Sequence, residues 1–520
     1  MKGTIGNLRG ATTPEGHLEV AVHAPRLPFG ALHAEPLTPV FQVDAVYPRV
    51  NTQLMRATTG RAIPGAGSGG AAVANNLFTV STGTTAYSYG TLQSRRRLRY
   101  RPGQGVVGRF TAVWSAPVAA SIVVAGYGTS ESGIYFGYNG TSFGLLHVTG
   151  GVREIHTLTV TTASTATNEY VVTLPDTSTV TVTATNNGST TRTAYEISLG
   201  TFPGWTASAV GATVVFLASD AGPKSGTFSL AQTGAGVPAA GADVETVAGV
   251  ASTDTWVPQS DWNGDRCDGT DTTRFQLDPS KGNVFQIGVQ YLGFGTVTCQ
   301  VEVPDEGGNN ADFVTCHTFN FPNSRTGVTF TQPSFPFTMT AYSAGSTTNV
   351  AVSVASFAGF IEGEIRLVGP RGSFQRETNG LVGSTASTYY PLFSIRNGLT
   401  VAARPNQAVV RVLSLSASHD DATPVAFALL RNPTLVGPVN FSAFSTNSVT
   451  EWDQGATTCT VASNEQIETT LMLGQSGGGN FPLSDAELLL QPGEVLTLAA
   501  RAVTGTATYV LGSVQVREDQ

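Results

Sequence analysis

The stretch GIYFGYNGTSFGLLHV, residues 133–148, sets the expected fold class of this chain. Ile134, Phe136 and Tyr138 would share one face of an extended strand, because successive strand side chains point to opposite faces. The pair Asn139-Gly140 follows at once, and Asn-Gly favours the positive φ angles of a type I′ hairpin turn. The stretch therefore predicts two antiparallel strands joined by a tight turn.

The same alternation recurs along most of the chain. Phe285, Ile287 and Val289 share a face in NVFQIGV, and residues 407–418 (QAVVRVLSLSAS) and 178–198 (STVTVTATNNGSTTRTAYEIS) alternate in the same way. No amphipathic helix longer than a single turn is expected. Many short strands between turn residues predict an all-β protein of tandem antiparallel β-sandwiches or jelly rolls.

Composition shifts predict four segments. Six prolines between Pro14 and Pro48 predict an extended N-terminal arm that lies along a partner surface rather than within a sheet. Low-complexity Gly/Ala stretches then suggest the other boundaries. The expected segments are an anchoring arm at 1–50, a first β-sandwich (a concanavalin-like jelly roll) at 51–245, a second β-sandwich at 246–395, and a C-terminal β region at 396–520 that shares strands with the second sandwich.

Charge and hydropathy exclude several classes of protein. Charged residues make up 12% of the 520 residues and the formal net charge is −8, which argues against a general nucleic-acid binder. No apolar run approaches the ~20 residues of a membrane-spanning helix. The N-terminus has no apolar signal-peptide core, so we expect a cytoplasmic protein or one that leaves the cell by a route other than secretion.

Five arginines crowd into SRRRLRYRPGQG, residues 94–105. In a strand, Arg95, Arg97, Arg99 and Arg101 would point one way and Tyr100 the other. Nucleic acid would favour aromatic side chains on the basic face, which this pattern does not provide. Two readings remain: pairing with acidic residues of the same chain, or an assembly surface for an acidic partner subunit, since the planar guanidinium pairs bidentately with carboxylates.

An acidic loop at 261–269, DWNGDRCDG, is a weak calcium candidate. Asp261, Asn263 and Asp265 match the first three oxygen positions of a calcium loop, but Arg266 stands where that loop needs glycine. The alternative, which we favour, is a set of Asx turns that tie down a long loop. No other cofactor is expected.

Four cysteines are too few to form a disulfide scaffold in a chain of this length. If residues 297–319 form a hairpin centred near 307–308, Val301 faces Val314 and Cys299 faces Cys316, close to disulfide geometry. A slip of one residue would destroy this pairing. The favoured alternative is two buried free thiols.

Little in the sequence predicts catalysis. The chain lacks a Gly-x-Ser-x-Gly elbow, a Walker glycine loop and a zinc-type histidine pair. Glu362 and Glu364 alternate onto one strand face and could mimic a glycosidase carboxylate pair, although carboxylates facing solvent are far more common. We therefore expect no enzymatic activity.

Several strings resemble poorly characterised structural proteins of tailed bacteriophages and other large double-stranded DNA viruses. The 133–140 hairpin also resembles a concanavalin-type jelly roll, a fold often used for glycan binding. These motifs mark packing and turns rather than a reaction. The strings are SRRRLRYRPGQGVVGRFTAVW (94–114), GIYFGYNGTSFGLLHVTGG (133–151), TWVPQSDWNGD (255–265), LDPSKGNVFQIGVQYLGFGTV (277–297), YYPLFSIRNG (389–398), LLRNP (429–433) and GTATYVLGSVQVREDQ (505–520).

The resemblance implies a virion structural protein, assembled in host cytoplasm and released with the particle. Its expected role is a tail fibre, spike or baseplate-associated component for host attachment. It would be a homo-oligomer, with a trimer as the first guess, joined through its arm to other virion proteins and contacting a host-surface glycan. The alternatives are a capsid or tail decoration protein without a receptor role, and a polysaccharide-degrading tailspike enzyme.

Overall fold

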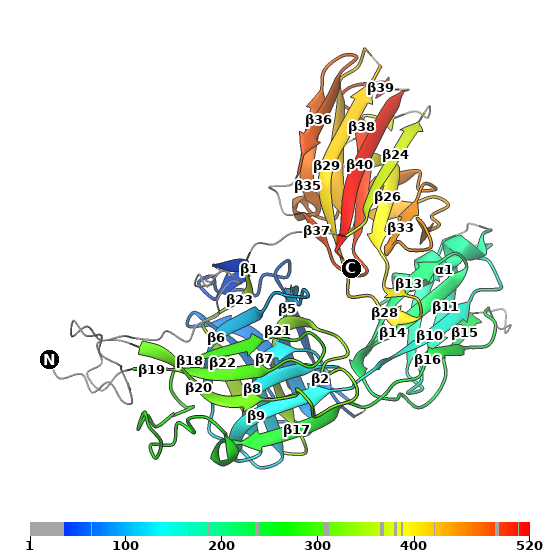
Figure 1. Ribbon diagram of the computed structural model, residues 1–520. Coiled ribbons are helices and arrows are strands. Elements are labelled where there is room, and N and C mark those ends of the chain that lie inside the picture. The colour runs from blue at the N-terminus through cyan, green and yellow to red at the C-terminus, as the bar shows by residue number, and fades with distance from the viewer. Residues whose placement is uncertain are drawn as a thin grey trace, which may run out of the picture.

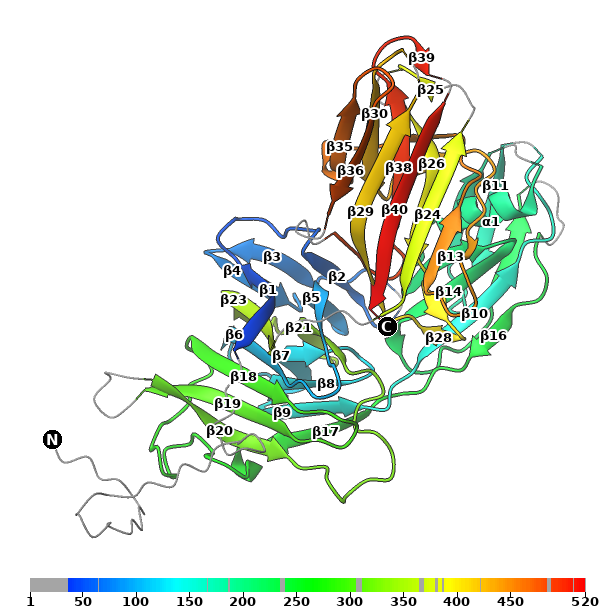
Figure 2. The same cartoon turned by 45° about the horizontal axis from the view of Figure 1, so that its top comes forward.

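The structure is a computed structural model that describes residues 36–519 except 64, 166, 186–187, 234–238, 305–310, 364–368, 379–381, 386–387, 421, 484–487 and 508. Within this part of the chain three β-rich domains pack against one another (Figures 1 and 2). The all-β fold class expected from the sequence is confirmed. No helix in the described ranges has the length and apolar character needed to cross a membrane.

The first domain is a sandwich of two antiparallel sheets. One has nine strands and the other seven, and both draw strands from distant parts of the sequence. The nine-stranded sheet contains β1 (Leu37–Asp44), β3 (Gly70–Ala74), β4 (Leu77–Ser81), β6 (Val106–Trp114), β18 (Asn283–Val289), β19 (Val297–Pro304), β20 (Ala311–Phe319), β22 (Ala351–Val354) and β23 (Ser356–Glu362). The seven-stranded sheet contains β2 (Met55–Arg61), β5 (Ser88–Arg99), β7 (Ser121–Gly128), β8 (Gly133–Asn139), β9 (Ser142–Thr149), β17 (Thr253–Pro258) and β21 (Ser334–Ser343).

Aromatic rings from both sheets fill the space between them. Phe285 of β18 stacks on Phe110 of β6, with 5.4 Å between ring centroids, and lies 4.7 Å from Phe136 of β8 in the facing sheet. Phe337 of β21 lies 5.6 Å from Phe110. These four side chains are at most 2% exposed, so the alternation in the sequence directs them into one core.

The second domain is inserted between β9 and β17, which are neighbours in the same sheet. It has a four-stranded and a three-stranded sheet with one helix between successive strands. The four-stranded sheet contains β10 (Arg153–Thr159), β13 (Trp205–Val210), β14 (Thr213–Ala221) and β16 (Val244–Val247). The three-stranded sheet contains β11 (Asn168–Thr173), β12 (Thr179–Ala184) and β15 (Ser229–Gln232); the helix is α1 (Thr190–Ser198).

The third domain is a second sandwich at the C-terminal end of the chain. Its sheets enclose a separate core that includes Phe374, Val516, Phe427 and Leu498. One sheet contains β24 (Arg371–Thr378), β29 (Val409–His419), β36 (Gly478–Pro482), β37 (Leu489–Leu490) and β40 (Val510–Asp519). The other contains β26 (Thr388–Asn397), β30 (Val425–Arg431), β31 (Thr434–Val436), β32 (Ser442–Ala443), β33 (Thr450–Asp453), β34 (Thr458–Thr460), β35 (Ile467–Leu473) and β38 (Val495–Ala502). Two small ribbons pair β25 (Val382–Gly383) with β39 (Thr506–Ala507) and β27 (Thr400–Val401) with β28 (Arg404–Pro405).

The domain boundaries expected from composition differ from those observed. The predicted units 51–245 and 246–395 share one sandwich, because β21 pairs with both β5 and β7 and β17 pairs with β9. The predicted boundary at 395/396 falls inside β26. A Gly/Ala-rich link marks a chain connection, but it does not reveal whether the chain later returns to an earlier sheet.

Part of the expected arm lies within the fold. Leu37–Asp44 forms β1 and pairs with β23, although Pro39 interrupts the register between the two strands. Phe41 is buried in the first core. The prediction of an arm outside any sheet is therefore wrong for this strand, because β1 has an edge position where a proline is tolerated. Residues 1–35 of the predicted arm lie outside the described residues.

Two local expectations also need correction. The hairpin after β8 has Gly140 at φ +60° as its first loop residue, whereas neither Asn139 nor Thr141 has a positive φ. This pattern is that of a type II′ turn rather than type I′. The alternating stretch 178–198 forms β12 and then α1, whose N-cap is Ser189; its side chain accepts a hydrogen bond from the backbone N–H of Arg192.

A buried histidine in β9 predicts how stability depends on pH. Burial, helped by the positive charge of Arg325, lowers the pKa of His147 to about 4. The unfolded chain therefore binds more protons between pH 6.5 and 4, so stability is retained above pH 6.5 and lost as the pH falls towards 4. In His147→Phe we expect the loss of stability on acidification to be smaller than in wild type by about 3 kcal/mol. Urea unfolding at pH 7 and pH 4 measures it, and an unchanged difference between wild type and variant would contradict it.

Candidate functional site

The arginine-rich strand β5 and the residues after it lie at the seam between the first and third domains. Leu98 and Tyr100 are buried in the first core, as the alternation predicts. Arg96, which strict alternation places on their side of the strand, instead lines the seam cavity with Arg97, Arg99 and Arg101. A bulge occurs between Gln93 and Arg97, where residues 94–96 of β5 oppose only Phe337 of β21. Arg97, Arg99 and Arg101 line a cavity together with residues of the third domain and are half-buried. Figure 2 shows the third domain beside this end of β5.

The arginines engage residues of the same chain that are hundreds of positions away. Arg101 forms a 2.9 Å ion pair with Asp519 of β40, and Arg95 lies 3.8 Å from Glu494. Arg97 donates to Oε1 of Gln407 at 3.0 Å. Of the two readings left open by the sequence, the structure supports the intrachain one. Contact of these arginines with another subunit stays a prediction.

A chain of hydrogen bonds at this seam connects all three domains. Arg97 of the first domain donates to Gln407 of the third, whose amide donates to Oε1 of Gln332 at 2.7 Å. Gln332 in turn donates to Oε1 of Glu131 at 2.6 Å. Arg153, at the start of the second domain, donates to Oε2 of Glu131 at 2.9 Å. Glu131 has a side chain that is only 1% exposed, so this carboxylate is the buried link between domains.

Crowded positive charge is the main electrostatic feature of the seam. Burial lowers the pKa of Arg97 to about 10; Arg153 and Arg56 lower it as well, and Glu131 acts in the opposite direction. Burial also lowers the pKa of Arg99, with Asp519 opposing and Arg101 reinforcing that effect. The seam therefore concentrates cations in a partly desolvated place.

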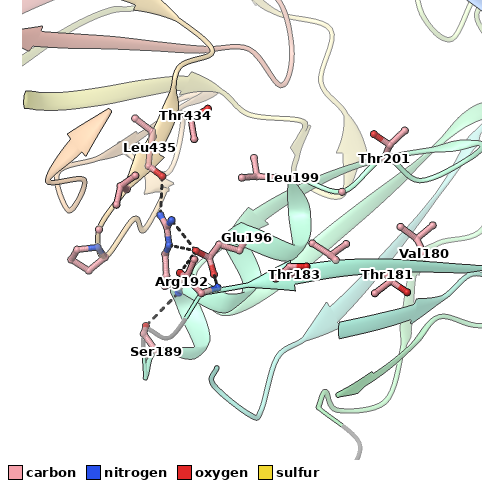
Figure 3. A pocket seen from close by; sticks show the side chains of 16 residues that line it. Val180, Thr181, Thr183, Ser189, Arg192, Glu196, Leu199, Thr201, Thr434 and Leu435 are labelled. Carbon is pink, nitrogen blue, oxygen red and sulfur yellow. Dashed lines mark hydrogen bonds and ion pairs between the residues drawn. The ribbon is translucent and has the colours of Figure 1, made fainter. Parts of the chain in front are cut away.

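A larger cavity, of about 760 Å³, lies between the second and third domains. It is lined by β12, both ends of α1 and residues 434–438 (Figure 3). Arg192 and Glu196 project into this region from one face of α1 and form a 2.9 Å ion pair. Glu196 also accepts from the backbone N–H of Thr185, and Arg192 donates to the carbonyl of Leu435 at 3.2 Å. These charged groups join two domains.

Hydrophobic packing makes the contact between the second and third domains core-like. One buried cluster includes Phe216 and Tyr195 from the second domain together with Leu435 and Phe441 from the third. Arg396 lies over the ring of Phe441, with its guanidinium carbon 4.2 Å from the ring centroid. Its Nη2 donates to the carbonyl of Ala209 in the second domain at 2.7 Å. Here the two domains share a single desolvated interior.

A buried histidine between two carboxylates lies inside the second domain. His156 of β10 has Nε2 2.6 Å from Glu154 and Nδ1 2.7 Å from Asp243. All three side chains are at most 4% exposed, and the ring packs against Trp205 and Phe228. Both ring nitrogens are therefore engaged by carboxyl groups, and the histidine bridges two acidic side chains within the domain. With no access from solvent, this group stabilises the domain rather than acting on a substrate.

The calcium candidates serve the loop itself. Asn263 makes two hydrogen bonds with the backbone of Thr318, and the Asp265 carboxylate accepts from the backbone N–H groups of Cys267 and Thr273. Asp261 accepts from the hydroxyl of the preceding Ser260. Within the described ranges, no group of three or more His, Cys, Asp or Glu residues is arranged for a metal ion. The arrangement matches the Asx-turn alternative, because backbone amides already occupy these oxygens.

Of the predicted glutamate pair, Glu362 lies within the described residues. Glu362, the last residue of β23, accepts from the backbone N–H of Gly105 at 3.2 Å and so holds the 101–105 turn. Its own carbonyl accepts from the side chain of Gln104. Glu364 lies outside the described residues.

The proposed disulfide is contradicted, and all four cysteines are buried free thiols. Val301 pairs with Val314 as expected, but a bulge between Cys299 and Gln300 places Cys299 opposite His317. The Cys316 thiol instead donates to the carbonyl oxygen of Cys299. Burial raises the pKa of each of these thiols, to about 12 for Cys267 and Cys459.

We expect the native protein to resist alkylation, because buried thiols with raised pKa values supply little thiolate. Iodoacetamide at pH 8 should leave the mass unchanged in native buffer. In denaturant without reductant it should add four labels, one for each cysteine of the sequence. Intact mass spectrometry reads this out, and only two labels would instead show that a disulfide had formed.

Comparisons with known proteins find solved structures of only very low similarity to this chain. No family model matches it, and no curated protein matches it. Similar solved structures include a laminarinase from Flavobacterium sp. UMI-01, at 11% identity and a TM-score of 0.24 over 62% of this chain and 100% of that one. Lectin II from Ulex europaeus gives 10% identity and a TM-score of 0.22 over 62% and 97% of the two chains. At these values the matches carry no argument about activity or ligand.

Sequence reasoning missed most partners at the seams. Asp519, Gln407 and Glu131 lie in unremarkable strings, and only the three-dimensional fold brings them to the arginines. His156 offered one usable signal: with Glu154 it forms an alternating Glu-x-His pair on one strand face, although nothing local points to Asp243.

Proposed function

We propose that this chain is a virion structural protein that displays β-sandwich domains for attachment to a host surface, as a tail fibre, spike or baseplate-associated component. The observation that carries the proposal is that three domains pack against one another through buried contacts. The second and third domains share a hydrophobic core, and the Glu131 link ties both to the first. A rigid unit suits a protein that holds surfaces at fixed positions. The phage-like strings in the sequence support the same assignment.

The proposal includes assembly and location. The chain would form a homo-oligomer, with a trimer as the starting hypothesis, and the part of the predicted arm that precedes β1 would anchor it to other virion proteins. Contact with a host-surface glycan would come from the sandwich domains. The protein would act without catalysis, assembled in the host cytoplasm and carried outside on the particle.

Mass spectrometry of purified virus particles from a host that expresses this chain tests the proposal. We expect the chain to be present at a stoichiometry consistent with a symmetric assembly, and its absence from the particles would overturn the proposal. Imaging of particles labelled at the C-terminus should place it at the tail, whereas a label over the whole capsid would indicate a decoration protein. Release of reducing sugars from host polysaccharide would instead indicate an enzyme.

A further inference from the structure

The seam between the first and third domains contains a small cavity of about 120 Å³ with an unusual lining. Five arginines line it and Asp519 is the one carboxylate among its lining residues. The arginines come from both sides: four from β5 and the turn after it, and one from β29 of the third domain. The lining arginines are Arg96, Arg97, Arg99, Arg101 and Arg411.

The strand register adds positive charge beside this cavity. Arg411 of β29 is directly opposite Arg517 of β40, and Arg517 is directly opposite Arg371 of β24. Like charges directly opposite one another on neighbouring strands are destabilising. A bound anion would therefore stabilise this row of three arginines beside the arginines of β5.

One buried donor at the cavity points to a ligand. Nη1 of Arg99 is inaccessible to solvent and has no hydrogen-bond partner among the described residues. A guanidinium donor left in this state costs free energy that a hydrogen-bonding anion would recover. Burial is the largest cause of the lowered pKa of Arg99, and the neighbouring charge of Arg101 lowers it further.

We propose that this seam is a binding site for a small tetrahedral oxyanion, a phosphate or sulfate group, held between Arg99 and the neighbouring arginines of both domains. Arginine forks pair bidentately with such oxygens, and donors that approach from two sides suit a tetrahedral group better than a planar carboxylate. The cavity has room for several water molecules and hence for a group of this size. An anion bound here would strengthen the docking of the third domain on the first, independently of the proposed virion role.

Isothermal titration calorimetry of the full chain with sodium phosphate, at ionic strength held constant with sodium chloride, tests the site. We expect saturable binding of one phosphate per chain and a rise in the unfolding temperature that sodium chloride does not reproduce. Arg99→Gln should weaken phosphate binding by about tenfold or more, since it removes one charged donor. Arg99→Lys, which keeps the charge but loses the fork, should weaken it less. Arg109→Gln, on β6 and away from the cavity, is the matched control and should bind as wild type does.

A second measurement guards against variants that merely unfold. Without phosphate, Arg99→Gln should be at least as stable as wild type, because the substitution relieves repulsion between arginines. When phosphate is added, the variant should not show the rise in unfolding temperature that wild type shows. Titration with glucose 6-phosphate identifies the source of the bound oxyanion. If it binds as inorganic phosphate does, the natural ligand is a phosphate monoester. If only inorganic phosphate binds, the natural ligand is the free ion. No saturable binding of either, or equal phosphate binding by wild type and Arg99→Gln, would overturn the proposal.

Discussion

Glu131→Gln is expected to lower the free energy of unfolding by about 3–5 kcal/mol, the usual cost of removing one partner of a buried ion pair. The carboxylate accepts from two donors, Arg153 of the second domain and Gln332 of the first. A glutamine offers one acceptor oxygen, and its NH₂ group would meet one of these donors. The Arg153 guanidinium, only 17% exposed, would also lose its counter-charge.

The same substitution should loosen the arrangement of the domains. Gln332 also accepts from Gln407 of the third domain, so a disturbed Glu131 affects both domain contacts. Small-angle scattering should show a larger radius of gyration, and urea unfolding should show a lower midpoint. Glu169→Gln, an exposed glutamate on β11, is the matched control and should change neither. If Glu131→Gln has the same free energy of unfolding and radius of gyration as wild type, this link does not hold the domains together.

His156→Leu is the second substitution with a large expected effect. It removes the two ring nitrogens that bridge Glu154 and Asp243, so both buried acidic side chains lose this hydrogen-bond partner. We expect a loss of about 3–5 kcal/mol in the free energy of unfolding. The loss should concentrate in the second domain, where the ring also packs against Trp205. Urea unfolding followed by tryptophan fluorescence measures it.

A double-mutant cycle separates the charge effect from lost packing. Adding Glu154→Gln to His156→Leu removes one of the two stranded carboxylates, so the double variant should be less destabilised than the sum of the single variants. Additive losses would instead mean that the histidine acts only by filling space.

Alternation along single strands was the reliable part of the sequence information. It predicted the buried faces of β18 and β19, the pairing of Val301 with Val314, and the split of the β5 arginines from Tyr100. These features depend on the two-residue repeat of an extended chain, which is local. The expected all-β class followed from many such repeats.

Features that depend on distant contacts could not be predicted in this way. A single bulge between Cys299 and Gln300 moves the cysteine away from its expected partner, and no local signal marks it. The helix α1 forms where Thr-rich alternation suggested a strand, since Ser189 caps it and Tyr195 and Ile197 find a core to pack in. For the candidate site, the sequence identified the arginines but not Asp519 or Glu131.

The insertion of the second domain has a consequence for the order in which the protein forms during synthesis. β9 ends at Thr149 and its neighbour β17 begins at Thr253, so the ribosome must deliver the whole intervening segment before these two strands can join. By then the ribosome has delivered all the strands of the second domain, residues 153–247. These strands depend on fewer residues that are synthesised later. β5 waits longer still, for β21 at 334–343.

The first domain, whose synthesis begins first, is thus among the later ones to complete its fold. Until then its exposed strand edges need protection from pairing with other chains. Domains generally form from the N-terminus onward, so this chain departs from the usual sequence of events. In released chains that end near residue 250, the middle segment should therefore resist protease better than the beginning.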